Sequence, residues 1–170
     1  NTESKIAKEK AGIIKEGVPC LWCGESKEAY ASIKEAASKK NSPLYLVDRT
    51  KVNVKLSTLD GTFFDFDEYK GVKINLLGEY QIINAANVLS AVKILKEAGI
   101  KIDESSVYTG MANAKWLARF EKLLNDPLVI FDGGHNPEGV DLCVKSVKNY
   151  FGKEKLVLLT GILADKDYSY

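Results

Sequence analysis

The sequence predicts an α/β protein made of two regions, a mixed region with antiparallel hairpins followed by a parallel α/β region. Between residues 52 and 77, three short runs alternate apolar and polar residues, which is typical of half-buried strands. Farther along, the apolar run Leu128–Phe131 precedes an amphipathic helical pattern, and a second apolar run follows at residues 156–160. This order of strand, helix and strand predicts a βαβ unit with a right-handed crossover. We place the boundary between the two regions near residues 115–120.

The amino-terminal part of the chain is expected to contain helices and short strands. Residues 3–15 follow a helical pattern, and the apolar runs 18–23 and 44–47 are strand candidates. Between these two runs, Ser26 is placed to cap a helix that continues to about residue 40. These elements precede the hairpin region.

Two turn signals divide the alternating runs into antiparallel hairpins. The runs 52–56 and 62–66 flank the dipeptide Asp60-Gly61, and the runs 62–66 and 72–76 flank Lys70-Gly71. Glycine in such a turn supplies the positive φ that tight hairpin connections need. We therefore expect antiparallel pairing throughout this part of the chain.

Three further helices are predicted by composition and periodicity. Residues 81–98 are so rich in Ile, Ala, Val and Leu that this helix must be largely buried, and Gly99 marks its end. Asp103 begins the next helix, which runs to about Ala114. Residues 138–151 place their apolar side chains on one stripe, so the last helix is expected to be amphipathic.

The overall composition is that of an ordinary globular protein without a strong charge. The chain has 170 residues, 45% of them hydrophobic, and 24 Lys and Arg oppose 23 Asp and Glu for a formal charge of +1. Such a balance supplies no general attraction for nucleic acids or anionic membranes, so any anion site must be local. We expect neither nucleic acid nor a membrane as a partner. Reduced cysteines and the lack of a long apolar span favour a soluble, cytoplasmic protein.

The cysteines and the chain ends each suggest one interpretation. Cys20 and Cys23 form a C-x-x-C pair, but they lie in an apolar run and His135 is the only histidine. No second ligand pair completes a closed zinc site, so we interpret these cysteines as structural. The chain begins at Asn1 without a methionine and ends at Tyr170 soon after a strand candidate. That pattern is the one expected of a segment from a longer protein.

The turn D-G-G-H-N-P, which follows the strand candidate Leu128–Phe131, is the strongest candidate site. Ligands of open α/β sheets bind beyond the carboxyl ends of the strands, where this turn is expected. The carboxylate of Asp132 suits a ribose hydroxyl pair, and the imidazole of His135 can reach a phosphate or an adenine. Pro137 leaves the following N–H groups free for an anion. The alternative is that Asp132 and Asn136 only cap the next helix. Neither a P-loop nor a dinucleotide fingerprint is present.

Each of the other polar candidates has a functional and a structural interpretation. Arg119 lies at the predicted boundary, where a guanidinium can reach phosphate oxygens across an interdomain cleft. It can equally pair with Glu121 at the surface. Gln81, Asn84 and Asn87 recur at a spacing of three in the buried helix, where amides either cap the first turn or read the edge of a base.

Five segments together resemble folylpolyglutamate synthase and dihydrofolate synthase, a family within the Mur ligase superfamily. They occur in the order and at the approximate spacing of that family and extend over nearly the whole chain. The segments are I-A-K-E-K-A-G-I-I-K-E-G-V-P (6–19), L-G-E-Y-Q-I-I-N-A-A-N (77–87), W-L-A-R-F-E (116–121), D-G-G-H-N-P-E-G (132–139) and G-I-L-A-D-K-D (161–167).

The resemblance implies a fold and an activity. Residues 1–115 would be the end of a Mur-ligase-type central ATPase domain, and residues 116–170 the start of a Rossmann-like carboxyl-terminal domain. ATP would phosphorylate the carboxylate of a folate or of dihydropteroate, and the amine of L-glutamate would then form the amide. Mg²⁺ is the implied metal, and the full-length protein is expected to be a monomer. The P-loop and the remaining Mg²⁺ ligands would lie upstream, so these residues alone are not expected to catalyse the reaction.

The resemblance also implies roles for single residues. Lys10 matches a lysine that the family carbamylates to help hold a second Mg²⁺, although on its own pattern it would be an exposed helical lysine. Carbamylation requires a neutral amine, so Lys10 is expected to be partly buried with a lowered pKa. Asn84 matches an adenine contact, Arg119 a phosphate contact, Asp132 the ribose contact and His135 a further nucleotide contact. Lys10, Arg119 and His135 are the catalytic candidates.

Four positions depart from the family pattern, and two alternative functions stay open. Tyr80 stands where the family commonly has histidine, Leu117-Ala118 replaces a common Pro-Gly, and Gly134 replaces the usual alanine. One alternative is another amino-acid ligase of the same superfamily. The other is a noncatalytic nucleotide-binding module, in which Arg119 and His135 would face the solvent or the core and no ATP cleft would form.

Overall fold

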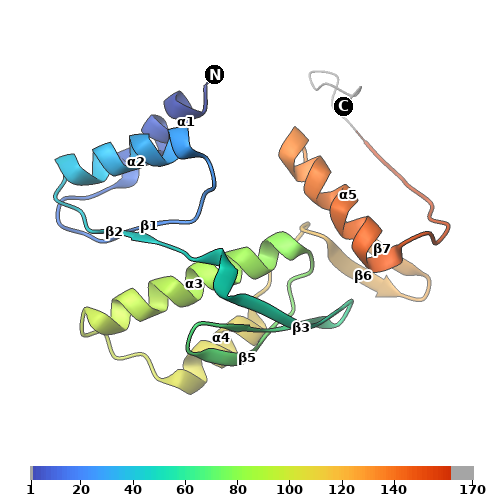
Figure 1. The fold of residues 1–170 in the computed structure, drawn as a ribbon. Coiled ribbons are helices and arrows are strands. Elements are labelled where there is room, and N and C mark those ends of the chain that lie inside the picture. The colour runs from blue at the N-terminus through green and yellow to red at the C-terminus, as the bar shows by residue number, and fades with distance from the viewer. Residues whose placement is uncertain (1, 162–170) are drawn as a thin grey trace.

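The computed structural model describes residues 2–161, which form three groups of elements (Figure 1). The first group contains α1 (Glu3–Lys10), a short 3-10 turn at Ala11–Ile13, β1 (Cys20–Trp22), α2 (Lys27–Lys39) and β2 (Leu44–Leu46). The second contains the 3-10 turn Arg49–Lys51, β3 (Val52–Thr58), β4 (Gly61–Phe66), β5 (Tyr69–Ile74), α3 (Glu79–Glu97) and α4 (Glu104–Asn113). The third contains β6 (Glu121–Asn125), β7 (Leu128–Phe131) and α5 (Pro137–Phe151).

The first group is a small parallel β-α-β arrangement covered by α1. β1 and β2 pair in parallel, and α2 connects them. Ser26 caps α2 as predicted, because its hydroxyl accepts a hydrogen bond from the N–H of Ala29 at 3.1 Å. Small side chains, mostly alanines, let α1 and α2 approach closely around their own core, which consists of Ala7, Ala11, Ile14, Ala29, Ile33 and Ala37.

The second group confirms the predicted antiparallel pairing, but its second turn lies at residues 67–68, and Lys70-Gly71 falls inside β5 instead. β3, β4 and β5 form an antiparallel sheet in that order. Gly61 begins β4 with a φ of +121°, and a Cβ at this position would lie 2.6 Å from the carbonyl oxygen of Ile74. A residue with a side chain would therefore be strained there, which explains the glycine of the turn.

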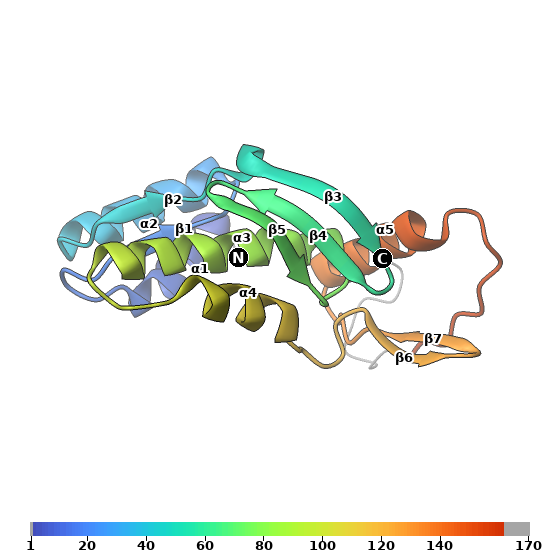
Figure 2. The same ribbon diagram turned by 90° about the horizontal axis from the view of Figure 1, so that it is seen from below.

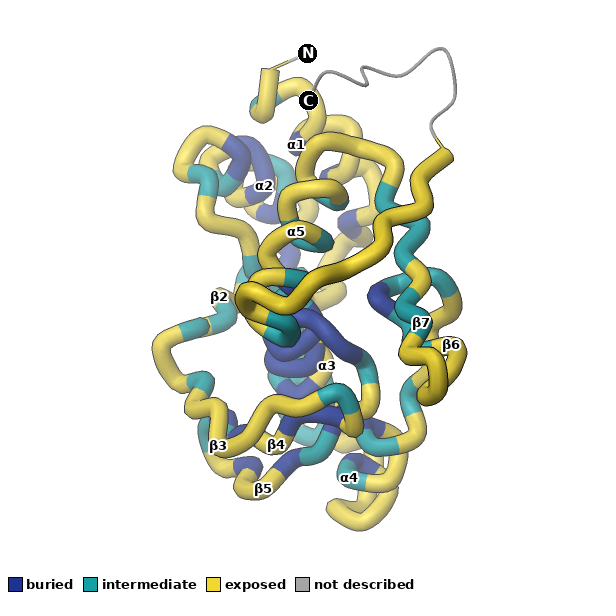
Figure 3. The backbone as a smooth tube through the Cα atoms, turned by 90° about the vertical axis from the view of Figure 1, so that its right-hand side faces the viewer, coloured by how far each residue is buried: buried dark blue, intermediate teal, exposed yellow. Residues whose placement is uncertain are grey.

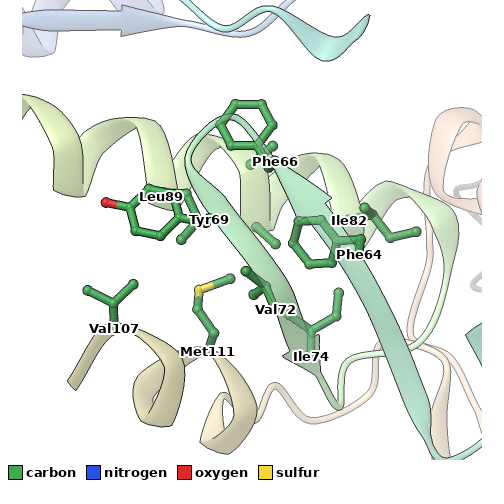
Figure 4. Close-up of a cluster of buried hydrophobic side chains, with 11 residues drawn as sticks. Phe64, Phe66, Tyr69, Val72, Ile74, Ile82, Leu89, Val107 and Met111 are labelled. Carbon is green, nitrogen blue, oxygen red and sulfur yellow. The ribbon is translucent and has the colours of Figure 1, made fainter. Parts of the chain in front are cut away.

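The helices α3 and α4 cover the inner face of this sheet and enclose the main core (Figure 4). Alternate residues of β4 and β5 point inward, as the period of two in the sequence requires. α4 begins where predicted, because the carboxylate of Asp103 accepts the N–H of Ser106 at 2.8 Å. The main core consists of Phe64, Phe66, Tyr69, Val72, Ile74, Ile82, Ala85, Ala86, Leu89, Val107 and Met111.

The third group differs from the predicted βαβ unit. β7 and α5 form as expected, but β7 pairs antiparallel with β6, a strand that the sequence analysis missed. Residues 156–160 form no strand, and the side chains of Val157 and Leu159 are 100% and 96% exposed. A strand needs a neighbour for its backbone N–H and C=O groups. None lies beside this segment within residues 2–161, so no parallel pair forms there.

The third group lies beside one end of the second (Figure 2). The turn between β3 and β4 and the start of α3 both approach α5 in the two ribbon views. Figure 3 shows that burial concentrates in α3 and the sheet, whereas α5 and the segment after it are largely exposed. Among residues 2–161, no helix has both the length and the apolar character needed to cross a membrane.

Candidate functional site

The turn between β7 and α5 is fastened to the segment that precedes β6. One carboxylate oxygen of Asp132 accepts the N–H of Gly134 at 2.6 Å, and the other accepts the N–H of Phe120 at 2.7 Å. The N–H of Gly133 in turn donates to the carbonyl of Ala118 at 2.9 Å. The first bond shapes the turn itself, and the other two hold the segments 118–120 and 132–134 against each other.

Arg119 is carried into this contact by an unusual backbone. The flanking residues Ala118 and Phe120 have φ values of +56° and +47°, a region that residues with side chains seldom adopt. The half-buried guanidinium donates to the carbonyl of Ala118 at 3.0 Å and lies close to Gly133. Glu121 does not pair with it but accepts the N–H of Ala118 at 2.8 Å. The surface ion pair considered for Arg119 and Glu121 is therefore not formed.

The glycines of the turn permit this close packing. A Cβ at Gly134 would lie 2.8 Å from Oδ1 of Asp132, and one at Gly133 would lie 3.3 Å from the carbonyl oxygen of Ala118. Glycine at position 134 therefore lets the Asp132 carboxylate fold back onto its own turn. A larger residue at this position would have to displace that carboxylate.

The uncharged side chains of Tyr80 and Cys143 lie near enough to Asp132 for its charge to affect their pKa values. Burial raises the pKa of Tyr80, the negative charge of Asp132 raises it further, and the positive charge of Arg119 opposes that rise. Burial, followed by the charge of Asp132, also raises the pKa of the Cys143 thiol on α5. We call Tyr80, Arg119, Asp132 and Cys143 the Arg119–Asp132 cluster. The sequence singled out Tyr80 only as a departure from a pattern and Cys143 only as a member of an apolar stripe.

Asn84 lies about one turn beyond Tyr80 on α3, beside an apolar cavity. Its side-chain amide donates to Oε1 of Gln81 at 3.0 Å, so these two amides bond to each other rather than cap the helix. The cavity between α3 and α4 has a volume of about 320 Å³, and Gln81, Asn84, Val88 and Met111 are among its lining residues. Arg119 lines a separate cavity of about 430 Å³ together with Lys73 and Trp116.

His135 and Asn136 occupy the exposed side of the turn. Nδ1 of His135 lies 3.3 Å from the carbonyl oxygen of Gly133, and the imidazole is otherwise open to solvent. Oδ1 of Asn136 accepts the N–H of Gly139 at 2.8 Å and so caps α5, with Pro137 in the first turn. The capping interpretation is thus right for Asn136, whereas Asp132 bonds to the turn and to Phe120.

Lys10 is not placed as expected. It is exposed in the last turn of α1 and forms no ion pair within residues 2–161, so the expectation of partial burial is wrong. Ala7 of α1, Ala11 of the following 3-10 turn and Ile14 belong to the core shared with α2, and Lys10 does not. In the part of the chain that the structure describes, no group of three or more His, Cys, Asp or Glu can hold a metal. These residues therefore do not fit Mg²⁺ by themselves.

Comparison with known proteins gives consistent matches over almost the entire chain. Folylpolyglutamate synthase of Lacticaseibacillus casei is 31% identical over 99% of the chain and 41% of the relative. Dihydrofolate synthase/folylpolyglutamate synthase of Bacillus subtilis is 32% identical over 99% of the chain and 40% of the relative. Dihydrofolate synthetase of Saccharomyces cerevisiae is 30% identical over 98% and 40%. The chain spans about two fifths of the length of these relatives. No family model matches it.

Solved structures give the same result for the fold. A folylpolyglutamate synthase complex with AMPPCP and folate superposes with a TM-score of 0.85 at 30% identity, over 99% of this chain and 42% of that one. Folylpolyglutamate synthase of Thermotoga maritima superposes with a TM-score of 0.84 at 38% identity, over 96% and 39%. The α/β fold class that the resemblance implied is therefore confirmed, although the segment 161–167 lies outside the described residues apart from Gly161. Over almost its entire length, this chain is therefore similar in sequence and in fold to a segment of the folylpolyglutamate and dihydrofolate synthases.

Proposed function

We propose that the protein that carries this chain is an ATP-dependent ligase that joins L-glutamate to folate, to dihydropteroate or to both. The observation that carries the proposal is the Arg119–Asp132 cluster, in which the guanidinium of Arg119 lies close to the glycine turn that carries the carboxylate of Asp132. The named relatives include both kinds of synthase, and one solved relative is a complex with AMPPCP and folate. AMPPCP is an analogue of ATP, so this complex supports ATP as a substrate in the proposed reaction.

The cluster has spare hydrogen-bonding capacity for a nucleotide. Each carboxylate oxygen of Asp132 accepts one backbone N–H and keeps a lone pair that can accept a ribose hydroxyl. One donor of Arg119 is used by Ala118, so the remaining guanidinium N–H groups can bind phosphate oxygens. Exposed His135 is free to contact the same nucleotide, and Asn84 offers an amide to the edge of a base. We assign these four residues to ATP, with Arg119 and His135 nearest the chemistry.

In the proposed reaction, an oxygen of the substrate carboxylate attacks the γ-phosphorus of ATP, and ADP leaves. The amine of glutamate then attacks the carbonyl carbon of the acyl phosphate, loses a proton and expels inorganic phosphate. That phosphate carries away one oxygen of the original carboxylate. Arg119 would act by neutralising charge on the transferring phosphoryl group, which is the main contribution of the protein in such reactions.

Mg²⁺ and Lys10 belong to a finer part of the proposal. Mg²⁺ would neutralise charge on the phosphates of ATP, but residues 2–161 offer no cluster of His, Cys, Asp or Glu that holds it. A carbamate on Lys10 would contribute a ligand only together with groups outside the described residues. We further infer a cytoplasmic, monomeric protein, in keeping with its three free cysteines.

The proposal is tested by following oxygen from the substrate to the product. The full protein is incubated with ATP, Mg²⁺, L-glutamate and either a folate or dihydropteroate whose reacting carboxylate carries heavy oxygen. We expect one heavy oxygen in the inorganic phosphate released with each amide. Amide formation with unlabelled phosphate would refute the acyl phosphate route, and the choice of substrate separates the two synthase activities.

A further inference from the structure

The last turn of α5 reaches the amino-terminal end of α3 through Tyr150. The N–H of Gly78 donates to the hydroxyl oxygen of Tyr150 at 3.2 Å, and Oγ of Ser57 on β3 lies 3.4 Å from the same oxygen. Gly78 is the N-cap residue of α3, and no side chain of its own segment caps that helix. Tyr150 therefore ties α5 to the residue from which α3 starts.

The ring of Tyr150 contacts the segment that carries Arg119. It stacks on the ring of Phe120 with centroids 5.5 Å apart and an angle of 24° between the planes. Phe120 is 1% exposed, it directly follows Arg119, and its N–H donates to Asp132 at 2.7 Å. A stacked pair at this separation is favourable beyond simple burial. The ring thus supports the turn that carries Arg119 and anchors Asp132.

Residues on one face of α5 contact the start of α3. Glu79 accepts the side-chain amide of Asn149 at 2.7 Å and pairs with Lys145 at 2.8 Å. Both contacts are exposed and therefore weak. Ser146, which is 3% exposed, lies beside Gly78 on the same face. Of these residues, only Tyr150 touches both α3 and the turn at 118–120.

We infer that Tyr150 is a positioning residue of the nucleotide site, an inference that rests on the proposed function. The proposed base contact, Asn84, is carried by α3, whereas the proposed phosphate and ribose contacts, Arg119 and Asp132, are carried by the third group of elements. One nucleotide can bind all three only if the two supports keep a fixed distance. The hydroxyl of Tyr150 holds the first support and its ring holds the second, so this side chain sets that distance.

The test uses Tyr150→Phe in the full protein, with ATP affinity measured by calorimetry and steady-state kinetics measured for ATP and glutamate. Phenylalanine keeps the stack on Phe120 and removes the hydroxyl that accepts the Gly78 N–H and contacts Oγ of Ser57. The expected result is an increase of about 3-fold to 10-fold in the Kd and KM for ATP, the loss that one hydrogen bond represents. The kcat should stay within about 2-fold and the KM for glutamate should not change, because the chemistry itself is untouched.

Tyr108→Phe is the matched control. The hydroxyl of Tyr108 accepts a backbone N–H, that of Lys70, at 3.1 Å, and its side chain is half-buried like that of Tyr150. It lies on α4, away from the Arg119–Asp132 cluster. Both substitutions remove a hydroxyl that accepts a backbone N–H and should lower thermal stability by similar amounts. Only Tyr150→Phe should weaken ATP binding, which separates positioning from a general loss of stability.

A second variant addresses the ring. Phe120→Leu keeps the hydrogen bond from Gly78 to Tyr150 and removes the stack, so it should also raise the Kd for ATP. This variant decides the matter if Tyr150→Phe does not fold. If the wild-type protein binds ATP and the folded variants bind it with the same affinity, the proposed role of Tyr150 is wrong. A wild-type protein that binds no ATP would instead overturn the proposed function.

Discussion

Gly78 shows at the scale of one residue how tightly α5 and α3 are packed. Its φ is +99°, and a Cβ at this position would lie 2.6 Å from the ring of Tyr80 and 3.2 Å from Oγ of Ser146. Gly78→Ala should therefore destabilise the protein by about 1–3 kcal/mol through backbone strain, with a further loss from the clash. Chemical denaturation measures the free energy of unfolding.

Gly99→Ala isolates the contribution of the backbone. Gly99 has a similar φ of +88°, but a Cβ there meets nothing within 4 Å. The excess loss for Gly78→Ala over Gly99→Ala reports the clash with Tyr80 and Ser146. Equal losses would mean that Tyr80 and Ser146 do not pack closely against Gly78.

Asp132 offers a second prediction at this scale, since its carboxylate bonds to the turn and is also proposed to bind ribose. Asp132→Asn preserves the size of the side chain but exchanges one acceptor oxygen for a donor that cannot pair with an N–H. We expect ATP affinity to fall by about 10-fold or more, because a charged acceptor is lost. Isothermal calorimetry on the full protein measures the change.

Asn136→Ala is the control for Asp132→Asn. Asn136 caps α5 through the N–H of Gly139, so its loss should cost about 1 kcal/mol of stability and leave ATP affinity unchanged. If Asp132→Asn behaves in the same way, Asp132 only stabilises the turn, and the ribose assignment is wrong.

At the scale of elements, local signals predicted most of the fold. Ser26 and Asp103 cap the helices that were expected to follow them, and Gly61 turns the chain between β3 and β4. Each signal acts within a few residues, which is why one sequence is enough to recognise it. β6 was missed because the run E-K-L-L-N has no clear alternation and becomes a strand only by pairing with β7. The predicted parallel pairing of residues 128–131 with residues 156–160 was wrong, because the partner of a strand depends on segments that are distant in the sequence.

The cap of α4 makes stability depend on pH. Hydrogen bonds from the hydroxyl of Ser105, then from the hydroxyl and N–H of Ser106, hold the pKa of Asp103 well below its usual value. A carboxyl whose pKa is lower in the folded state stabilises the protein above its unfolded pKa of about 4, and this contribution is lost as the pH falls. Wild type should therefore lose its stability advantage over Asp103→Ala progressively below about pH 4.

Denaturation at several pH values checks this prediction, with Ser105→Ala as a milder variant. The Ser105 hydroxyl donates to Asp103 at 2.6 Å, so removing it should shrink the pH dependence without abolishing it. A difference between wild type and Asp103→Ala that stays constant from about pH 7 to about pH 2 would show that ionisation of the cap does not stabilise α4.

At the scale of the whole molecule, the candidate site forms where the second and third groups of elements meet. Lys122 and Asp60 pair across this junction at 2.6 Å, and Tyr150 joins α5 to α3. The sequence predicted that Arg119 and Asp132 belong to one site, because both lie in segments that resemble a known family. It gave no sign that Tyr80 and Cys143 join them, since no local pattern reports contacts between distant helices. The expected burial of Lys10 was wrong for a different reason. The resemblance implied neighbouring groups around this lysine that residues 2–161 do not supply.

The most direct test of the central claim is to assay the full protein for coupled ADP release and product mass. The reaction contains ATP, Mg²⁺, L-glutamate and either dihydropteroate or a tetrahydrofolate, and single omissions of each component serve as controls. The account predicts one ADP for each product molecule, and a product heavier than the substrate by one glutamate residue. Binding of ATP without any glutamate-dependent product from either substrate would contradict it and leave a noncatalytic nucleotide-binding protein.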